Sequence, residues 1–250
     1  MTEHIRAECH RHCLTITLNR PDKHNALTNA MYDSLSGMLM SAGADDNVRV
    51  VIIHGGPECF TAGNDLADFL QTPPDSLDAP AFRFMAAVVA LDKPLIAAVC
   101  GAAIGIGTTL LSHCDFVMAT RNSRFATPFI KLGLCQEFAA SLLLPKRLGH
   151  GYASRLLLGG ESIDGEQAHA LGLCTHLFTQ GQECLDFAQD YAERLATASP
   201  EALQAAKHLM KAPQQESVLN IIRQENLNFI ARLQTRECRQ ALEDFVYKRR

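Results

Sequence analysis

The sequence predicts an α/β fold in its first half and a helical region in its second. Short apolar runs that end at glycine or another turn residue recur up to about residue 120, as expected for covered strands. Beyond residue 145 such runs nearly vanish and amphipathic helical patterns replace them. A chain of 250 residues with 47% hydrophobic residues fits one large domain with a substantial core.

Four runs predict strands, namely CLTITL, VRVVIIHGG, KPLIAAVCG and CDFVMAT. The first alternates apolar and polar residues before a proline, and VRVVIIHGG is a continuous apolar run closed by two glycines. After the first strand Thr28 predicts an N-cap. The helix that follows carries one apolar face, formed by Met31, Leu35, Met38 and Ala42. Residues 72–80, TPPDSLDAP, have the composition of a loop.

In the second half, Asp164 and Gln167 have the spacing of a capping box. The segments DFAQDYAERLA and PEALQAAKHLM are amphipathic and predict helices. A further helix is indicated by Leu219, Ile222, Phe229 and Leu233. The exception is LCTHLF at 173–178, which has a strand-like pattern.

Composition narrows the range of functions. The formal net charge of −4 gives no electrostatic footprint for nucleic acid or an anionic membrane. No apolar run is long enough to span a bilayer, and the first residues lack the apolar core of a signal peptide. Nine cysteines without a CxxC pair favour a reduced, cytoplasmic protein. Cys9 and Cys13 with their neighbouring histidines lack a second ligand pair, so we expect no metal.

Three strand-to-helix junctions carry the unusual residues: LNRPDKHNALT (18–28), CFTAGNDLADF (59–69) and VCGAAIGIGTTLLSHCD (99–115). Glycines there allow the backbone to approach a ligand closely, and a helix start presents free N–H groups. Two N–H groups converging from different junctions would form an oxyanion hole. Phosphate binding is the rival use, but GIGTTL lacks the third glycine of a dinucleotide fingerprint, and no GxxxxGK[ST] occurs.

The motifs LNRPDKHNALT, CFTAGNDL, GAAIGIGTTLLSHCD, TPFIKLGL and the closing LEDFVYKRR together resemble the enoyl-CoA hydratase/isomerase (crotonase) family. The resemblance covers nearly the whole chain, with the motifs in the family order. It implies a spiral of ββα units over residues 1–195, with the α/β part mainly in 1–145, and a helical trimerisation region over 196–250. It also implies a homotrimer, often as a dimer of trimers.

The same resemblance implies how an acyl thioester would be held. The family places one oxyanion donor at the residue after the AG turn, which is Asn64 here. The second donor corresponds to Ile106, where hydratases usually have glycine. A backbone donor survives that change, provided the local φ suits a β-branched side chain.

Catalytic carboxylates distinguish the subfamilies. The positions of the two hydratase glutamates are occupied by Thr109 and Phe129, neither of which can act as a carboxylate acid or base. Peroxisomal-type Δ3,Δ2-enoyl-CoA isomerases resemble one another in having a single glutamate after the TPF…LG element, where Glu137 stands. From the residues alone the alternative is that Glu137 begins a helix near Gln136 and complements its dipole.

For coenzyme A, the resemblance implies contacts from the first junction at Lys23, Asn25 and Ala26, with Ala62 in the AG turn beside them. Phe245 and Lys248 match an aromatic–lysine pair near the adenine end in relatives, although an ordinary helix terminus has the same composition. Asp65 is expected to fix the oxyanion turn rather than to react. No cofactor is expected besides the coenzyme A of the substrate.

We therefore expect an acyl-CoA enzyme of fatty-acid β-oxidation that converts 3-enoyl-CoA into trans-2-enoyl-CoA. Glu137 would be the base, and the N–H groups of Asn64 and Ile106 the oxyanion donors. One alternative is a hydratase or another crotonase-fold reaction. The other is a non-catalytic acyl-CoA or protein-binding module. Acyl chain length is not readable from the loop at 67–85.

Overall fold

A six-stranded sheet forms the centre of the molecule in the computed structural model, which describes residues 2–247. Its strand order is β1-β2-β3-β4-β6-β9, with β1 antiparallel to β2 and the other pairs parallel. The bounds are β1 (Ile5–His10), β2 (Cys13–Leu18), β3 (Val50–His54), β4 (Leu95–Val99), β6 (Phe116–Thr120) and β9 (His176–Phe178). A second sheet of three short strands has the order β5-β7-β8, namely β5 (Ala102–Ile104), β7 (Arg124–Ala126) and β8 (Ser162–Asp164).

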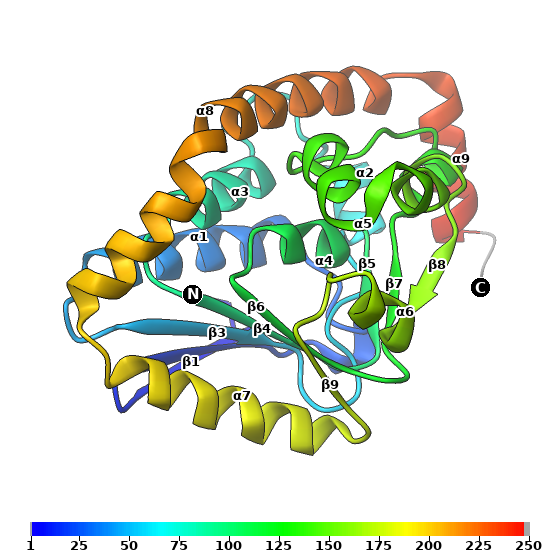
Figure 1. Cartoon of the computed structure of the whole chain (residues 1–250). Helices are drawn as coiled ribbons and strands as arrows, with labels where there is room; N and C mark the ends of the chain where they lie inside the picture. The colour runs from blue at the N-terminus through cyan, green and yellow to red at the C-terminus, as the bar shows by residue number, and fades with distance from the viewer. Residues whose placement is uncertain (1, 248–250) are drawn as a thin grey trace.

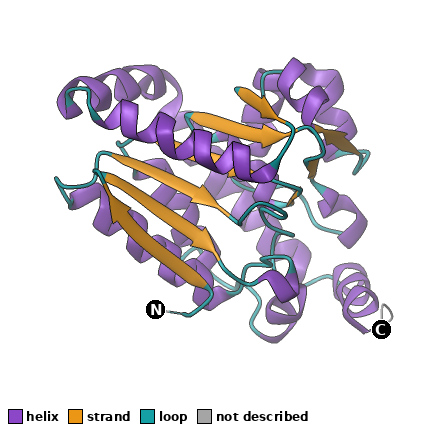
Figure 2. Ribbon diagram, turned by 90° about the horizontal axis from the view of Figure 1, so that it is seen from below, coloured by secondary structure: helices purple, strands orange, loops and turns teal. Residues whose placement is uncertain are grey.

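Helices cover both faces of the large sheet. The α-helices are α1 (Asn29–Ala44), α2 (Leu66–Gln71), α3 (Pro80–Ala90), α4 (Ile106–Thr109), α5 (Ala140–Leu157), α6 (Gly165–Ala170), α7 (Gly181–Ala196), α8 (Pro200–Leu233) and α9 (Arg236–Tyr247). Short 3-10 turns are η1 (Pro21–Lys23), η2 (Leu110–Ser112) and η3 (Pro128–Leu132). Helix α7 lies across one sheet face, and α1 and α3 lie on the other side, below α8 (Figures 1 and 2).

The predicted α/β fold is confirmed, including the strands at the four apolar runs and the helix capped by Thr28, whose side chain accepts from the Met31 N–H at 3.3 Å. The capping box at Asp164 and Gln167 is also present. The sequence patterns missed β1, because five of its six residues are exposed and the segment contains no continuous apolar run. They also missed β5, β7 and β8, since three residues are too few for a visible period.

The C-terminal helices differ from their prediction in one respect. PEALQAAKHLM and the segment up to Leu233 form a single 34-residue helix, α8, that continues through Pro213. Leu219 was placed on its apolar face, but it is 47% exposed, and Val218 is buried in its place. The buried face runs through Val218, Ile222, Glu225 and Phe229, which follows the helical period from a start one residue earlier. The boundary at 195/196 stays a prediction.

An ion pair attaches α8 to the edge of the core. Lys207 Nζ lies 2.8 Å from Asp115 Oδ2 and donates to the Lys93 carbonyl oxygen at 2.5 Å. Asp115 also accepts from the Leu95 N–H at 2.8 Å, at the start of β4. Burial lowers the pKa of Lys207 to about 8, with Asp115 acting against that effect. The pair thus joins the C-terminal helix to the central sheet.

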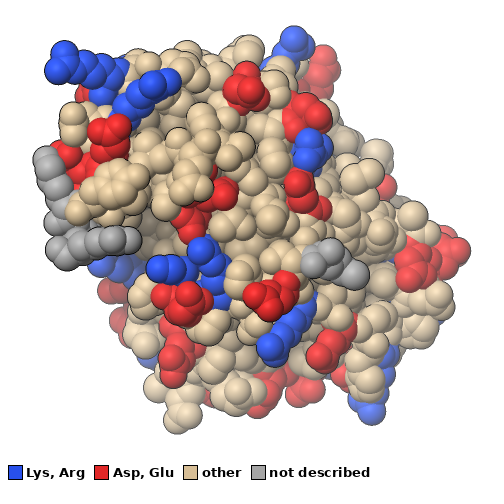
Figure 3. Space-filling view, turned by 180° about the vertical axis from the view of Figure 1, so that it is seen from behind, with Lys and Arg blue, Asp and Glu red and all other residues tan. Residues whose placement is uncertain are grey.

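On the surface, acidic and basic side chains are interspersed over the face seen in Figure 3. Among the described helices, none is both long and apolar enough to cross a membrane.

The buried ion pair gives a stability prediction. Asp115→Ala should lower the free energy of unfolding by about 3 kcal/mol, because it leaves the Lys207 charge buried without its anion. Glu166→Ala is the matched control, since its pair with Arg121 at 2.6 Å is exposed on both sides and should contribute at most about 1 kcal/mol. Urea unfolding of both variants measures this. Equal losses would contradict a structural role for the buried pair.

Candidate active site

Two of the three junctions are held against one another by backbone hydrogen bonds. The Thr61 N–H donates to the Ala102 carbonyl at 2.9 Å, and the Ile104 N–H donates back to Thr61 at 3.0 Å. Gly63 stands at φ +87°, and a Cβ there would lie 2.5 Å from the Ile104 carbonyl oxygen. Only glycine permits this approach, which brings the turn before Asn64 against the strand that precedes Ile106.

Both predicted oxyanion donors have free N–H groups. The bridge between Leu27 and Asn64 uses the Gly63 carbonyl and the Asp65 N–H, so the Asn64 N–H faces away from it. Ile106 is the first residue of α4, where a helix has no internal acceptor for its N–H. Within residues 2–247 neither N–H donates to a protein acceptor. Free N–H groups at two joined turns can donate hydrogen bonds to an anionic oxygen.

The turn at Asn64 is fixed from its C-terminal side, as expected for Asp65. The Asp65 carboxylate caps α2 by accepting from the Ala67 and Asp68 N–H groups at 3.0 and 3.1 Å. Its other oxygen lies 2.6 Å from a guanidinium nitrogen of Arg20, which also donates to the Ala26 carbonyl at 3.0 Å. These contacts lower the Asp65 pKa although burial opposes them. Asp65 therefore stays charged and ties the first two junctions together.

Glu137 is buried, with 1% of its surface exposed. Burial raises its pKa from 4.5 to about 8; the nearby Glu225 charge raises it further, and a hydrogen bond from the Asn64 side chain lowers it in part. Among the described residues, its Oε1 atom has no hydrogen-bond partner. A carboxyl group in this state binds a proton readily and has one oxygen available for a ligand.

The Asn64 side chain connects Glu137 to the core. Its Oδ1 accepts a short hydrogen bond from the hydroxyl of Tyr32, a buried residue of α1. With the oxygen so engaged, the amide N–H₂ is oriented as a donor toward Glu137. Burial, together with the charges of Glu137 and Asp68, holds the Tyr32 pKa well above its usual value, so the phenol stays protonated. Two predicted site residues, Glu137 and Asn64, are therefore neighbours through their side chains.

The backbone after Glu137 takes an unusual path. Phe138 and Ala139 have φ values of +62° and +55°, and α5 begins only at Ala140. Such a conformation costs about 1–3 kcal/mol per non-glycine residue and persists only where neighbours enforce it. His113 does so by a 2.8 Å hydrogen bond to the Phe138 carbonyl and by stacking on its ring at 4.0 Å. Glu137 thus precedes the helix, which rules out the alternative of a first-turn acid.

The His113 ring is neutral at ordinary pH. Burial lowers its pKa to about 3, and the charges of Lys211 and Arg147 act in the same direction. Its Nε2 faces a carbonyl oxygen, which can only accept, so the Nε2 atom carries the proton. His113 thus braces the turn behind Glu137 as a neutral hydrogen-bond donor.

Neither of the two positions that carry glutamates in hydratases has a group free to transfer a proton here: one is an aromatic ring, and the other is a hydroxyl that is hydrogen-bonded within its own helix. Thr109 Oγ1 donates to the Ile106 carbonyl of its own helix at 3.4 Å. Phe129 is 5% exposed, and a Cβ built on Gly105 would touch its ring at 3.7 Å. An aromatic ring therefore lies beside the turn that leads to Ile106.

The residues predicted to hold coenzyme A lie on two separated parts of the chain. Lys23 is exposed at the end of η1, and Ala26 and Ala62 are half-buried. Asn25 is buried: its amide donates to the carbonyls of Gly55, Cys59 and Phe60, and so braces the first junction against the second. Phe245 is 42% exposed on α9. Lys248 lies outside the described residues. Their roles stay predictions.

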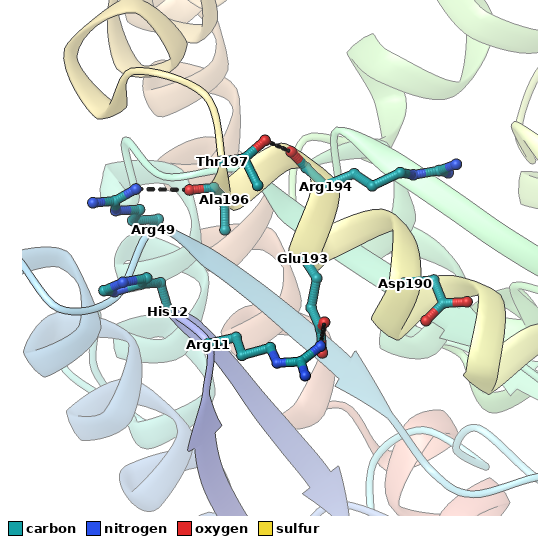
Figure 4. A pocket seen from close by; sticks show the side chains of 8 residues that line it. All are labelled: Arg11, His12, Arg49, Asp190, Glu193, Arg194, Ala196 and Thr197. Atoms are coloured by element: carbon teal, nitrogen blue, oxygen red, sulfur yellow. Dashed lines mark hydrogen bonds and ion pairs between the residues drawn. The ribbon is translucent and has the colours of Figure 1, made fainter.

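A cavity lies beside the β1–β2 turn and the end of α7. It measures about 580 Å³ and is lined by Arg11, His12, Arg49, Asp190, Glu193, Arg194, Ala196 and Thr197 (Figure 4). Arg11 is paired with Glu193 at 2.7 Å, and Arg194 points away along α7. Its charged side chains do not converge on one point, and none is a predicted site residue.

Sequence patterns missed Tyr32, His113 and Glu225 as parts of this site. Tyr32 and His113 lie within apolar segments and resemble core residues. Glu225 carried a signal, because it follows Ile222 by three residues on the apolar face of α8, and a charge at a core position indicates a partner or a function.

The close approach at Gly63 gives a second prediction. Gly63→Ala should lower the free energy of unfolding by about 2 kcal/mol more than Gly56→Ala, because overpacking is added to the strain of a positive φ. Gly56 is the matched control: its φ is +92°, but a Cβ there has nothing within 4 Å. Chemical denaturation of both variants measures the difference, and equal losses would show that the junctions are not in tight contact.

Burial of Glu137 predicts a pH-dependent stability. Its folded-state pKa of about 8 exceeds the ordinary 4.5, so the folded protein binds this proton more tightly than the unfolded chain does. Stability is therefore lost as pH rises from about 4.5 to about 8. Glu137→Gln lacks this loss, and its melting temperature relative to wild type should rise across that range. A constant difference between pH 5 and pH 9 would contradict it.

Comparisons with known proteins agree with this geometry. The model of the enoyl-CoA hydratase/isomerase family matches residues 8–250. The chain is 35% identical over 237 residues to the 2,3-dehydroadipyl-CoA hydratase of Escherichia coli (strain K12), covering 94% of this chain and 92% of that protein. It is 31% identical to enoyl-CoA delta isomerase 2 of Rattus norvegicus, covering 94% of this chain and 61% of that protein. The structure of Pseudomonas aeruginosa OdaA superposes with a TM-score of 0.96 and 47% identity, covering 98% of this chain and 100% of that one. The chain belongs to the enoyl-CoA hydratase/isomerase family and is an acyl-CoA enzyme of the crotonase fold.

Proposed function

We propose that the protein isomerises 3-enoyl-CoA to trans-2-enoyl-CoA with Glu137 as its single acid–base group. The observation that carries this proposal is the Glu137 carboxyl, which is buried, has a pKa of about 8 and keeps one oxygen without a partner. A base that must take a proton from carbon and return it to carbon works best with a pKa near the working pH.

The reaction moves one proton from C2 to C4, and no atom is added to or lost from the substrate. Glu137 in its ionised form takes a proton from C2 of the 3-enoyl thioester, and the electron pair spreads over C2, C4 and the thioester oxygen. The N–H groups of Asn64 and Ile106 receive the negative charge on that oxygen. Glu137 then gives its proton to C4, which leaves the double bond between C2 and C3.

The two N–H groups contribute through their fixed positions. A missing oxyanion donor costs about 3 kcal/mol of transition-state stabilisation in enzymes of this kind. The Gly63 approach and the Arg20–Asp65 pair hold the two turns before substrate arrives, which supports a preorganised site. Ile106 is the first residue of helix α4 and is not among the described residues with positive φ, so its β-branched side chain is compatible with the backbone conformation of the donor.

Hydration of a 2-enoyl-CoA is the second candidate, and the similarity to the Escherichia coli hydratase favours it. Adding water requires one group to activate the water and another to protonate carbon. Thr109 and Phe129 stand at the two family positions for these groups. The Phe129 ring beside Gly105 also fills space with an apolar surface. These residues favour isomerisation over hydration.

The family fold also supports a homotrimer or a dimer of trimers. Apolar side chains on the outer face of α8 agree with such an assembly, among them Leu209 and Met210, which are 71% and 77% exposed in the single chain. A cytoplasmic location is supported by the nine cysteines, all of which have free thiols. Fatty-acid β-oxidation is the corresponding process.

The test is incubation with 3-enoyl-CoA while the absorbance of the conjugated thioester is followed. Conversion should occur, kcat/KM should rise with pH up to about 8 because Glu137 must be ionised, and Glu137→Gln should lose about a thousandfold in kcat. Glu216→Gln, an exposed change on α8, is the control and should match wild type. Loss of absorbance from 2-enoyl-CoA, without conversion of 3-enoyl-CoA, would establish hydration instead.

A further inference from the structure

A second buried carboxyl, Glu225, lies at the turn that follows Glu137. It belongs to α8, more than eighty residues away in the chain, and only 7% of its surface is exposed. Its Oε1 accepts from the Ser141 N–H at 2.9 Å, and the N–H groups of Ala139 and Ala140 also act on it. These are the first N–H groups of α5, which no residue before that helix caps with a side chain.

We propose that Glu225 is a positioning residue for Glu137: it holds the amides that follow the strained Phe138–Ala139 turn and so fixes where the Glu137 carboxyl lies. This inference rests on the proposed function only in naming Glu137 as the base. Such a contact is needed because two consecutive non-glycine residues at positive φ keep that backbone conformation only where neighbouring groups hold it. His113 holds the Phe138 carbonyl and ring, while Glu225 holds the N–H groups on the other side of the turn.

The charge on Glu225 has a second effect. Its negative charge raises the Glu137 pKa beyond the effect of burial. Burial raises the pKa of Glu225 itself, and the hydrogen bonds from Ser141 and the helix start lower it in part. Those hydrogen bonds favour its charged form, and it is this charge that acts on Glu137. A capping residue without charge would hold the turn but leave Glu137 a weaker base.

Other groups around the pair do not supply this charge. Tyr32 on α1 and Cys135 before the turn are both held neutral, since burial raises the Tyr32 pKa well above its usual value and the Cys135 pKa to about 11. Asp68 on α2 acts on Tyr32 and accepts from the Asn29 N–H at 2.8 Å. Arg232 on α8 lies 2.8 Å from the Glu237 carboxylate and acts on Cys135.

The two roles separate in two variants. Glu225→Gln keeps an oxygen that can accept from Ser141 but removes the charge, so the midpoint of Glu137 should move toward lower pH by on the order of one unit. Glu225→Ala removes the acceptor as well, so kcat should also fall about tenfold to a hundredfold with KM little changed, as expected for a displaced reacting group. Glu216→Gln makes the same charge change at an exposed site of α8 and should alter neither.

The Glu137 midpoint is measured without substrate, by ¹³C NMR of glutamate labelled at the side-chain carboxyl, with the resonance assigned from its absence in Glu137→Gln. The acid limb of kcat/KM with 3-enoyl-CoA reports the same free-enzyme midpoint by kinetics. An unmoved midpoint in Glu225→Gln overturns the charge effect, and wild-type kcat in Glu225→Ala overturns positioning. If wild type does not isomerise 3-enoyl-CoA, the proposed function fails, while a moved NMR midpoint still supports the link between Glu225 and Glu137. Should Glu225→Ala not fold, Glu225→Leu replaces it, because leucine fills the space but also lacks the acceptor for the Ser141 N–H: wild-type kcat in that variant overturns positioning.

Discussion

The buried carboxyl of Glu137 is the constraint on which the arrangement of this molecule depends. Burying such a group without full hydrogen bonding is costly, and the protein retains it by keeping it protonated near neutral pH and by surrounding it with rigid neighbours. Asn64 contacts it from the second junction, and His113 braces the turn behind it. Helix α8 contacts the start of α5, just after this turn, through Glu225. Each of these neighbours comes from a different segment, so the site exists only when the complete chain is folded.

The same scaffold separates binding of the thioester from the choice of reaction. The two backbone N–H groups proposed as oxyanion donors belong to turns that are fixed by the approach of Gly63 to Ile104, and this arrangement does not depend on which proton transfer follows. Side chains on neighbouring turns then decide which carbon gains or loses a proton. Thr109 and Phe129 occupy two of those places, and this is why the proposed reaction uses Glu137 alone and shifts a double bond instead of adding water.

Sequence patterns predicted the strands at β2, β3, β4 and β6, because continuous apolar runs have a clear local cause. The roles expected for Glu137, Asn64 and Ile106 came from the resemblance to the family and stay predictions. The rest depends on contacts between distant segments. The positive φ of Phe138 and Ala139 is enforced by His113 and α8, and no local pattern favours it in these residue types. Leu219 shows the same limit, since a one-residue shift in helical phase decides which side chain is buried.

Helix α8 has a consequence for how the gene can be divided. Lys207, which pairs with Asp115 at the sheet, and Glu225, which meets the start of α5, lie on one helix about 27 Å apart. The last fifty residues are therefore an integral part of the fold of the single chain. A shortened chain that stops after α7 would keep every described strand, but it would lose the contacts that α8 makes with Asp115 and with the start of α5. In hybrids between relatives, exchanging this helix would also exchange the carboxyl group that contacts the start of α5 beside Glu137.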